Sequence, residues 1–312
     1  MQGCKRLLGK TSARAATQFR LAYLQKNKMK NLIKEIFRKI FSLFTIGISP
    51  FLKQQNDLLL LDHLENLKTN ARNPLNKCGA KYFSQNDEDG ITSEIVRRLG
   101  FKTGVFAEFG VGDGSENNTL ILLANGWKGF WSGGEGLCFN HTTNPDRFAF
   151  FQRWINRQNI VDIYENGLKV IGEKSVDILS FDLDGNDYYL IEKILSANIS
   201  PKLLIVEYNS KFPAPIKWKI AYDEKHVWVF DDYFGASLAE YSDMLSRFGY
   251  TLICCNLTGS NAFFIKNEFM NLFPDVPKDM TSIFYEPLLY TLHAYGFRPS
   301  PKTIEMMINS EL

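Results

Sequence analysis

Acidic side chains follow two apolar segments of the chain, "ILSF" and "LLIV", which are typical of short buried strands. The carboxyl ends of neighbouring parallel strands meet at one edge of a sheet, where open α/β sheets bind their ligands. Carboxylate and amide oxygens are hard ligands that suit Mg²⁺, and they also accept hydrogen bonds from sugar hydroxyls. The candidate metal ligands are Asp182, Asp184, Glu207 and Asn209.

Asp182 and Asp187 are also candidate catalytic groups, together with His226. A hydroxyl is a poor nucleophile, so a reaction at a hydroxyl needs a base or a metal. His226 lies in a long polar and aromatic segment, 210–235, and long loops in compact domains are usually functional. The structural alternatives are that Asp182 and Glu207 cap neighbouring helices and loops, and that His226 is an ordinary surface histidine. The aromatic residues that could stack on a sugar here are Trp218, Tyr222, Trp228, Tyr233 and Phe234.

A glycine-rich turn follows an earlier apolar strand, in "VFAEFGVGDGSENNT" over 105–119. Glycines at such a turn let the backbone bend tightly and approach a ligand, and an acid at the end of the strand can accept hydrogen bonds from it. Glu135 follows the next predicted strand, "KGFWSGG", behind two glycines. A tight turn of purely structural purpose is the alternative. The candidate cofactor-binding residues are Glu108, Gly110, Gly112, Asp113, Gly114 and Glu135.

Strands and helices alternate from about residue 84 onward, which predicts a parallel α/β sheet. The segment "YTLICCNLTGSNAFFIKNE" predicts a final hairpin with an antiparallel edge strand. We therefore expect a doubly wound, mostly parallel, seven-stranded Rossmann-like sheet over 80–268. A basic N-terminal arm with helices precedes it over 1–79, and a C-terminal extension follows over 269–312.

The net charge of +2 conceals an uneven distribution. Residues 1–50 contain 11 Lys and Arg and one acid, whereas 25 basic and 33 acidic residues remain in 51–312. An acidic body argues against nucleic acid as a partner. The basic, amphipathic spacing over 30–45 predicts a helix that either contacts the inner face of a membrane or a partner, or packs on its own domain.

The five cysteines show no CxxC spacing, and no run of 18 apolar residues exists. Neither a disulfide framework nor a membrane span is predicted, and a cytoplasmic setting is the expectation. The sequence makes no prediction about the oligomeric state.

The spacing E-F-G-x-G-x-G over 108–114 resembles motif I of class I S-adenosylmethionine-dependent methyltransferases. The strand ends "FDLDGND" and "LLIVEYN", followed by the hairpin, are similar to the order of motifs in the FkbM-type family, over roughly 82–268. The resemblance implies that S-adenosylmethionine lies over the turn, with Glu108 and Gly110 beside its methionine part. It also implies that an acid after the next strand binds the ribose hydroxyls; here that acid is Glu135, which two glycines displace from the strand end. It also implies methyl transfer to a hydroxyl of a sugar, glycan or glycolipid precursor, with Mg²⁺ as a second candidate cofactor.

Two other functions fit parts of the sequence. "DLDG" over 182–185 is similar to the nucleophile motif of haloacid-dehalogenase-type phosphohydrolases, although Asn186 replaces the expected hydroxyl residue and two strand–helix units precede the motif. The other alternative is a non-catalytic Rossmann-like binding module, favoured by the unusual "WSGGEG" strand end.

Overall fold

A computed structural model describes residues 34, 35, 37–39, 50–52, 54, 55, 58–287 and 299–309. The chain divides into two units, Met1–His63 and Leu64–Leu312. Within the predicted basic helix over 30–45, the described residues are helical, and the other positions of that prediction lie outside the described residues. Contact of this helix with a membrane therefore stays a prediction. In the described part of the chain, no helix combines the length and the apolar character needed to traverse a bilayer.

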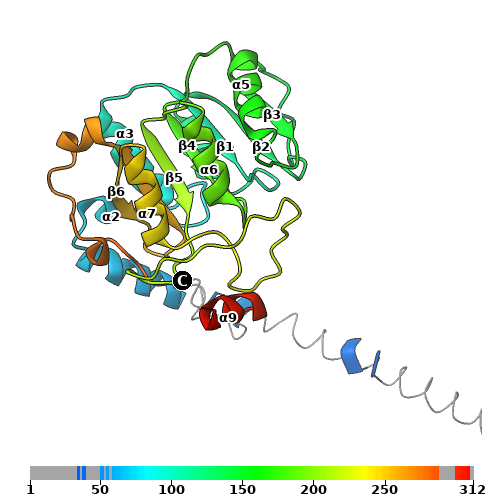
Figure 1. Cartoon of the computed structure of the whole chain (residues 1–312), viewed down its shortest axis with the longest axis vertical. Helices are drawn as coiled ribbons and strands as arrows, with labels where there is room; N and C mark the ends of the chain where they lie inside the picture. Colours follow the sequence, from blue (N-terminus) through cyan, green and yellow to red (C-terminus); the bar gives the residue numbers. More distant parts are fainter. Residues whose placement is uncertain are drawn as a thin grey trace, which may run out of the picture. The chain divides into compact units, whose positions relative to one another are not determined.

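A single seven-stranded sheet organises the second unit (Figure 1). Its strand order is β3-β2-β1-β4-β5-β7-β6, and all neighbours are parallel except β7, which is antiparallel to β5 and β6. The predicted fold class is confirmed. The antiparallel strand is not at the edge, however, because β7 is inserted between β5 and β6. The strands are β1 Val105–Phe109, β2 Lys128–Gly133, β3 Phe148–Gln152, β4 Ile178–Phe181, β5 Leu203–Glu207, β6 Tyr250–Cys255 and β7 Asn261–Lys266.

Helices cover both faces of this sheet, which makes a three-layer arrangement (Figure 1). The cluster on one face contains α5, α6 and α7, and the cluster on the other face contains α2, α3 and α4. The helices are α2 Pro74–Lys77, α3 Glu88–Leu99, α4 Leu120–Ala124, α5 Ile160–Ile171, α6 Asp187–Ser196, α7 Leu238–Arg247 and α9 Pro301–Ile308, with 3₁₀ turns η1 Asn267–Leu272 and η2 Met280–Ser282.

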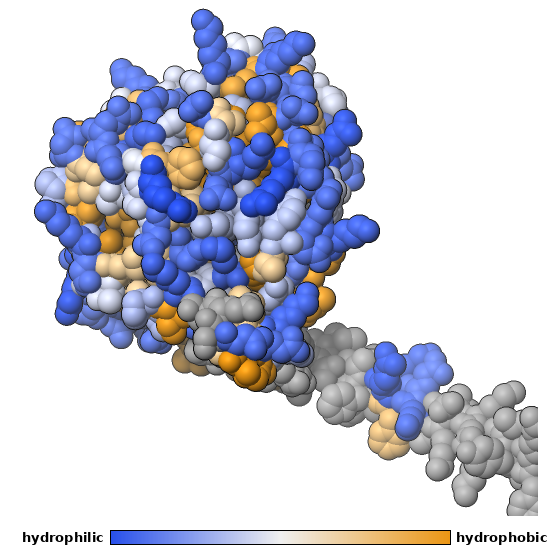
Figure 2. Space-filling model, in the orientation of Figure 1, coloured by the Kyte–Doolittle hydropathy of each residue, from blue (hydrophilic) through white to orange (hydrophobic). Residues whose placement is uncertain are grey.

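Alternation along β5 shows how the strands separate these two clusters. Leu203 and Ile205 join the α2–α4 side, whereas Leu204 and Val206 join the α5–α7 side. Successive side chains of a strand point to opposite faces, so a strand that is apolar throughout can be buried on both. Outside this core, hydrophilic residues cover most of the face seen in Figure 2, and hydrophobic ones form small separate patches.

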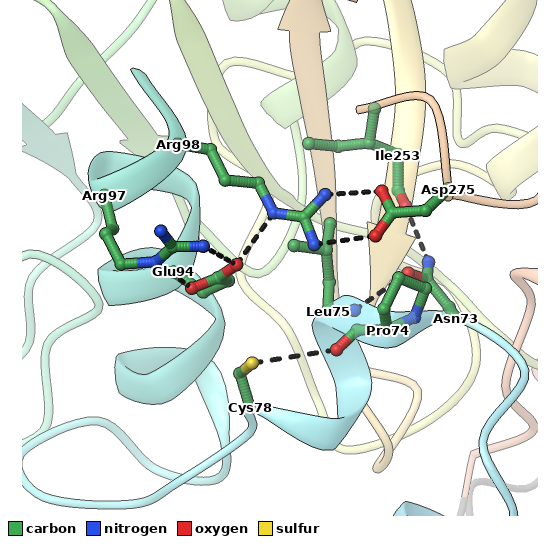
Figure 3. A network of polar contacts seen from close by, with 9 residues as sticks. All are labelled: Asn73, Pro74, Leu75, Cys78, Glu94, Arg97, Arg98, Ile253 and Asp275. Atoms are coloured by element: carbon green, nitrogen blue, oxygen red, sulfur yellow. Dashed lines mark hydrogen bonds and ion pairs between the residues drawn. The ribbon is translucent and has the colours of Figure 1, made fainter. Parts of the chain in front are cut away.

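Polar contacts fix α2 and α3 around the β6 end of the sheet (Figure 3). Asn73 donates a 2.7 Å hydrogen bond to the backbone carbonyl of Ile253 in β6. Arg98 binds Glu94 within α3 and pairs with both carboxylate oxygens of Asp275, at 2.6 and 3.0 Å. A two-pronged Arg–carboxylate contact fixes geometry as well as charge. The Arg98–Asp275 pair therefore holds the end of α3, which precedes β1, against the segment that follows η1.

Candidate functional site

Two cavities lie at the carboxyl ends of the parallel strands, as Rossmann-like sheets predict. Cavity I, of about 380 Å³, lies toward β2 and β3, and cavity II, of about 390 Å³, lies toward β5. Cavity I is lined by residues that include Glu135, Arg153, Trp154, Asn186, His226 and Phe230. Cavity II is lined by residues that include Gln85, Glu108, Asp113, Glu116, Glu207 and Ser260. The residues common to both cavities are Gly110, Gly112, Asp182, Asp184 and Trp228.

The glycine-rich turn separates the two cavities, and each of its first two glycines has a different reason to be glycine. Gly110 has φ of +96°, and a Cβ added there would lie 1.7 Å from the backbone oxygen of Asp182. A Cβ added to Gly112 would meet nothing within 4 Å. Gly110 is therefore required by the fold, whereas Gly112 borders open cavity space, where its backbone is accessible to a ligand.

Glu108 is almost fully buried, with 2% of its surface exposed, and its carboxylate is saturated by protein donors. It accepts hydrogen bonds from the backbone N–H groups of Asn118 and Thr119 at 3.0 and 3.1 Å, and from the Thr119 hydroxyl at 2.6 Å. Burial raises the pKa of Glu108, and these donors oppose the rise. The predicted cofactor residue thus borders cavity II while its carboxylate caps the start of α4.

Three of the predicted metal ligands come together. Asp182, Asp184 and Glu207 each offer a carboxylate oxygen, and these oxygens lie within 4.8 Å of one another. Burial, together with the neighbouring carboxylates, raises the pKa of Asp182 and of Glu207 well above their usual range. Glu207 Oε2 is buried without a hydrogen-bond partner. A divalent cation would satisfy that oxygen and relieve the repulsion, so the donor set fits Mg²⁺.

Two other predicted residues use their polar atoms within the protein. Asp187 is buried at the start of α6, and its two oxygens accept the N–H groups of Leu183 and Gly185 at 2.8 and 3.1 Å. Asn209 is buried too, and its amide donates to the carbonyls of Asp232 and Phe234 at 2.9 and 3.1 Å. Neither side chain lines the described cavities. Asp187 shapes the turn that carries Asp182, and Asn209 anchors the following loop.

Glu135 and Asp113 are exposed on opposite sides of the turn. Glu135 lines cavity I just beyond β2, where the ribose contact was predicted. Asp113 lines cavity II, and its Oδ1 accepts the N–H and hydroxyl of Ser115 at 3.0 and 2.5 Å, which lowers its pKa. Both carboxylates are accessible, and each adds negative charge to its cavity.

Part of the segment 210–235, which was predicted as functional, closes one side of cavity I, but Trp228 is the only one of its five candidate stacking rings that lines cavity I or II. We define residues 222–236 as the strap; its His226, Val227, Trp228 and Phe230 line cavity I, and Trp228 also lines cavity II. His226 Nε2 is buried without a partner, and burial, followed by the nearby Lys302, lowers the pKa of His226. A neutral imidazole on the cavity wall has the chemistry of a general base.

Several cavity residues escaped the sequence-based prediction. Arg153 and Trp154 line cavity I just after β3, and Ser260 lines cavity II at the turn between β6 and β7. The apolar run "FAFFQ", which forms β3, was not among the predicted strands, so the residues after it carried no signal. Recognition of β3 as the strand next to β2 would have pointed to Arg153 and Trp154.

No family model matches this sequence, and no curated protein matches it either. Among solved structures, it is similar to a candidate hemolysin from Lactococcus lactis, at 11% identity over 60% of this chain and 90% of that one, with a TM-score of 0.38. It is also similar to an O-methyltransferase family 2 protein from Planctomyces limnophilus in complex with apigenin. The identity is 13% over 52% of this chain and 51% of that one, with a TM-score of 0.31. The pyocyanin biosynthetic protein PhzM is 15% identical over 57% of this chain and 56% of that one, with a TM-score of 0.32.

Proposed function

We propose that this chain is a class I S-adenosylmethionine-dependent methyltransferase of the FkbM type. The observation that carries the proposal is the glycine-rich turn between two cavities, with the open Gly112 facing cavity space. In this proposal the methionine part lies beside Gly110 and Gly112, and the ribose hydroxyls bind Glu135 in cavity I. Trp228 lines both cavities and would cover the cofactor where they adjoin.

The charge of the cavities favours a cationic cofactor over a phosphate-containing one. S-adenosylmethionine carries a sulfonium and an ammonium, and carboxylates complement both. Cavity II includes Gly110 and Gly112, beside which the methionine part would lie, and it has no Lys, Arg or His among the described residues that line it. A dinucleotide would place its pyrophosphate on the N–H groups that open the helix after the turn. In this chain the Glu108 carboxylate already accepts the N–H groups of Asn118 and Thr119.

We further propose that the acceptor is a hydroxyl of a sugar, glycan or glycolipid precursor that binds in cavity II. The carboxylates there, with the amides of Gln85 and Asn117, are suited to bind a molecule with many hydroxyls. Methyl transfer depends mainly on holding the acceptor oxygen in line with the methyl group. Asp182 is the proposed base, because it lines both cavities, and its raised pKa would make it a stronger base than an ordinary carboxylate once it is ionised. His226 is the alternative base on the cavity I side.

Mg²⁺ is a second proposed cofactor, held by Asp182, Asp184 and Glu207. When bound, it would lower the pKa of an acceptor hydroxyl. In that case the three carboxylates serve as ligands, and the role of base passes to His226.

The phosphohydrolase alternative is less well supported by the cavities. An aspartyl phosphohydrolase needs positive charge around the phosphoryl oxygens. Neither cavity includes a lysine among its described lining residues. The basic residues that line cavity I are Arg153 and His226. A non-catalytic binding module would share the cofactor site but transfer no methyl group.

Calorimetric titration with S-adenosylmethionine and S-adenosylhomocysteine tests the proposal directly. Gly112→Val places a branched side chain in open cavity space, so it should block the cofactor without disturbing the fold. Gly136→Val is the matched control, because Gly136 also lacks a positive φ, has its nearest Cβ neighbour at 3.7 Å and lines neither cavity.

The proposal expects micromolar binding by the wild type and by Gly136→Val, and at least tenfold weaker binding by Gly112→Val, roughly 1.4 kcal/mol or more. Absence of binding by folded wild type would refute it. Phosphatase activity lost in Asp182→Asn would support the phosphohydrolase instead. Cofactor binding without methylation of any hydroxyl-rich acceptor, with or without Mg²⁺, would favour the binding module.

A further inference from the structure

The strap is fixed to the rest of the domain at its beginning, close to cavity I. The Asn186 side chain donates to the Asp223 carbonyl at 2.7 Å and accepts the Asp223 N–H at 3.3 Å. Trp154 Nε1 donates to the Glu224 carbonyl, and Asn156 donates to the Glu224 carboxylate, both at 2.8 Å. These contacts join the strap to the segments that follow β3 and β4.

Near its other end, the strap depends on one buried carboxylate. Asp232 Oδ2 pairs with the Lys211 ammonium at 2.7 Å, and 1% of the Asp232 side chain is exposed. Its Oδ1 accepts the Ser300 N–H at 2.7 Å and the Thr303 hydroxyl at 2.9 Å. A buried carboxylate that loses a donor is strongly destabilised, so all three contacts matter to the position of this residue.

Two of those three donors belong to the C-terminal helix α9. Ser300 is its N-cap and also accepts the Thr303 N–H at 2.9 Å. Lys302 lies 4.8 Å from the centre of the Tyr233 ring, and Met306 packs against the cluster of Phe212, Trp218, Ile220 and Tyr233. The α9 segment thus contacts the strap through two hydrogen bonds to a carboxylate, a cation–π contact and an apolar side chain.

The residues held by α9 adjoin the strap residues that line cavity I. The ring of Tyr233 lies 5.9 Å from that of His226, and Phe234 lies 5.5 Å from Trp228. The Tyr233 hydroxyl accepts the N–H of Ala221, the residue just before the strap, at 3.2 Å. A shift of Asp232 and Tyr233 would therefore move the wall of the cavity.

We propose that α9 is a latch that holds the strap against cavity I, and that Asp232 and Thr303 are positioning residues for the ligand in that cavity. As far as it concerns the ligand, this inference rests on the proposed function. The latch itself rests only on the contacts between α9 and the strap.

Hydrogen exchange and cofactor titration on the full chain test the latch together. Thr303→Val removes one donor to Asp232 with little change in shape, and Thr303→Ser restores a hydroxyl as the matched control. Thr303→Val should speed exchange of amides in the strap, such as those of His226 and Gly235, roughly tenfold, because a hydrogen bond to a charged group is lost. Amides of β4 and β5 should be unaffected. S-adenosylmethionine should bind roughly tenfold more weakly to this variant, and Thr303→Ser should recover both values.

Different results would contradict the latch, the positioning role and the proposed cofactor. Unchanged strap exchange in both Thr303→Val and Asp232→Asn would overturn the latch. Faster strap exchange with unaltered cofactor affinity would overturn the positioning role. Faster strap exchange in a chain whose wild type binds no S-adenosylmethionine would uphold the latch and refute the proposed cofactor.

Discussion

The backbone of Gly110 meets the backbone of Asp182 so closely that no side chain fits between them. A Cβ on Gly110 would lie 1.7 Å from the Asp182 carbonyl oxygen, and Gly110 already has φ of +96°. This contact brings the end of β1 against the end of β4. It therefore joins the glycine-rich turn to the acidic cluster, the two features that the proposed function needs side by side.

Gly110→Ala should destabilise the fold severely, whereas Gly112→Ala should not. The first variant combines a left-handed backbone with a clash against main-chain atoms, for an expected loss of ~3 kcal/mol or more. The second enters open space and should change the free energy of unfolding by less than ~1 kcal/mol. Urea denaturation of both variants measures the difference. Equal stability of the pair would show that β1 and β4 can separate at this point.

Glu108→Ala should lower stability as well as any cofactor affinity. The variant leaves the buried N–H groups of Asn118 and Thr119 and the Thr119 hydroxyl without their acceptor. Each unsatisfied buried group costs about 1–3 kcal/mol, so a loss of at least ~2 kcal/mol is expected. Thermal and urea unfolding check it. A fully stable Glu108→Ala chain would mean that water replaces the carboxylate at the start of α4.

Asp87 should make the protein less stable as the pH rises from about 4 to about 7. Burial, followed by repulsion from Glu88, raises the pKa of Asp87 from 3.8 to about 7. Below pH 4 the group is protonated in both folded and unfolded chains and has no effect. Between the two pKa values the folded chain binds the extra proton, so stability falls by up to ~1.4 kcal/mol per pH unit and then levels off.

The Asp87→Asn variant isolates this effect, because it keeps an acceptor for the Leu257 N–H but cannot ionise. The free energy of unfolding of the wild type minus that of the variant should decrease between pH 4 and pH 7. A difference independent of pH would contradict the raised pKa.

Removal of Glu207 should reveal whether the acidic cluster holds a metal. If Mg²⁺ binds, millimolar Mg²⁺ should raise the Tm of the wild type, and EDTA should abolish the rise. Glu207→Gln should lose this response, because one of the three carboxylates is gone. Glu116→Gln removes an acid from the same cavity but outside the cluster, and it should behave as the wild type.

A Tm that does not respond to Mg²⁺ would show that the three carboxylates share protons without a metal. In that case Glu207→Gln would raise the Tm, because a buried like charge is removed.

Much of the sheet could be predicted from the sequence, because its strands are apolar runs bounded by glycine or polar residues. Strand β1 is apolar from Val105 to Ala107, and β5 from Leu203 to Val206. The position of β7 could not be predicted in this way. Its place between β5 and β6 is fixed by pairs such as Leu204 with Phe264, which are far apart in the sequence.

The site was predictable as a set of residue types but not as a set of roles. The positions of Asp182 and Glu207 after two strands predicted that they would meet, and they do. Asp187 has the same residue type and a similar position, yet two backbone N–H groups of the preceding turn occupy its carboxylate. Such use of a side chain depends on local backbone direction, which spacing alone does not reveal. The hydrogen bond between Asp232 and Thr303 of α9 joins residues 71 positions apart, so no local sequence pattern could indicate it.

The sharing of Gly110, Gly112, Asp182, Asp184 and Trp228 by cavities I and II has a consequence for inhibitor design. Under the proposed function, a single molecule with a cationic nucleoside-like half and a polyhydroxylated half would occupy both cavities through a short linker past Gly112. Its second half would then bind at a high effective concentration, so the two modest affinities would nearly multiply. Because the linker must pass the turn without a side chain in its way, Gly112→Val would confer resistance to such a compound.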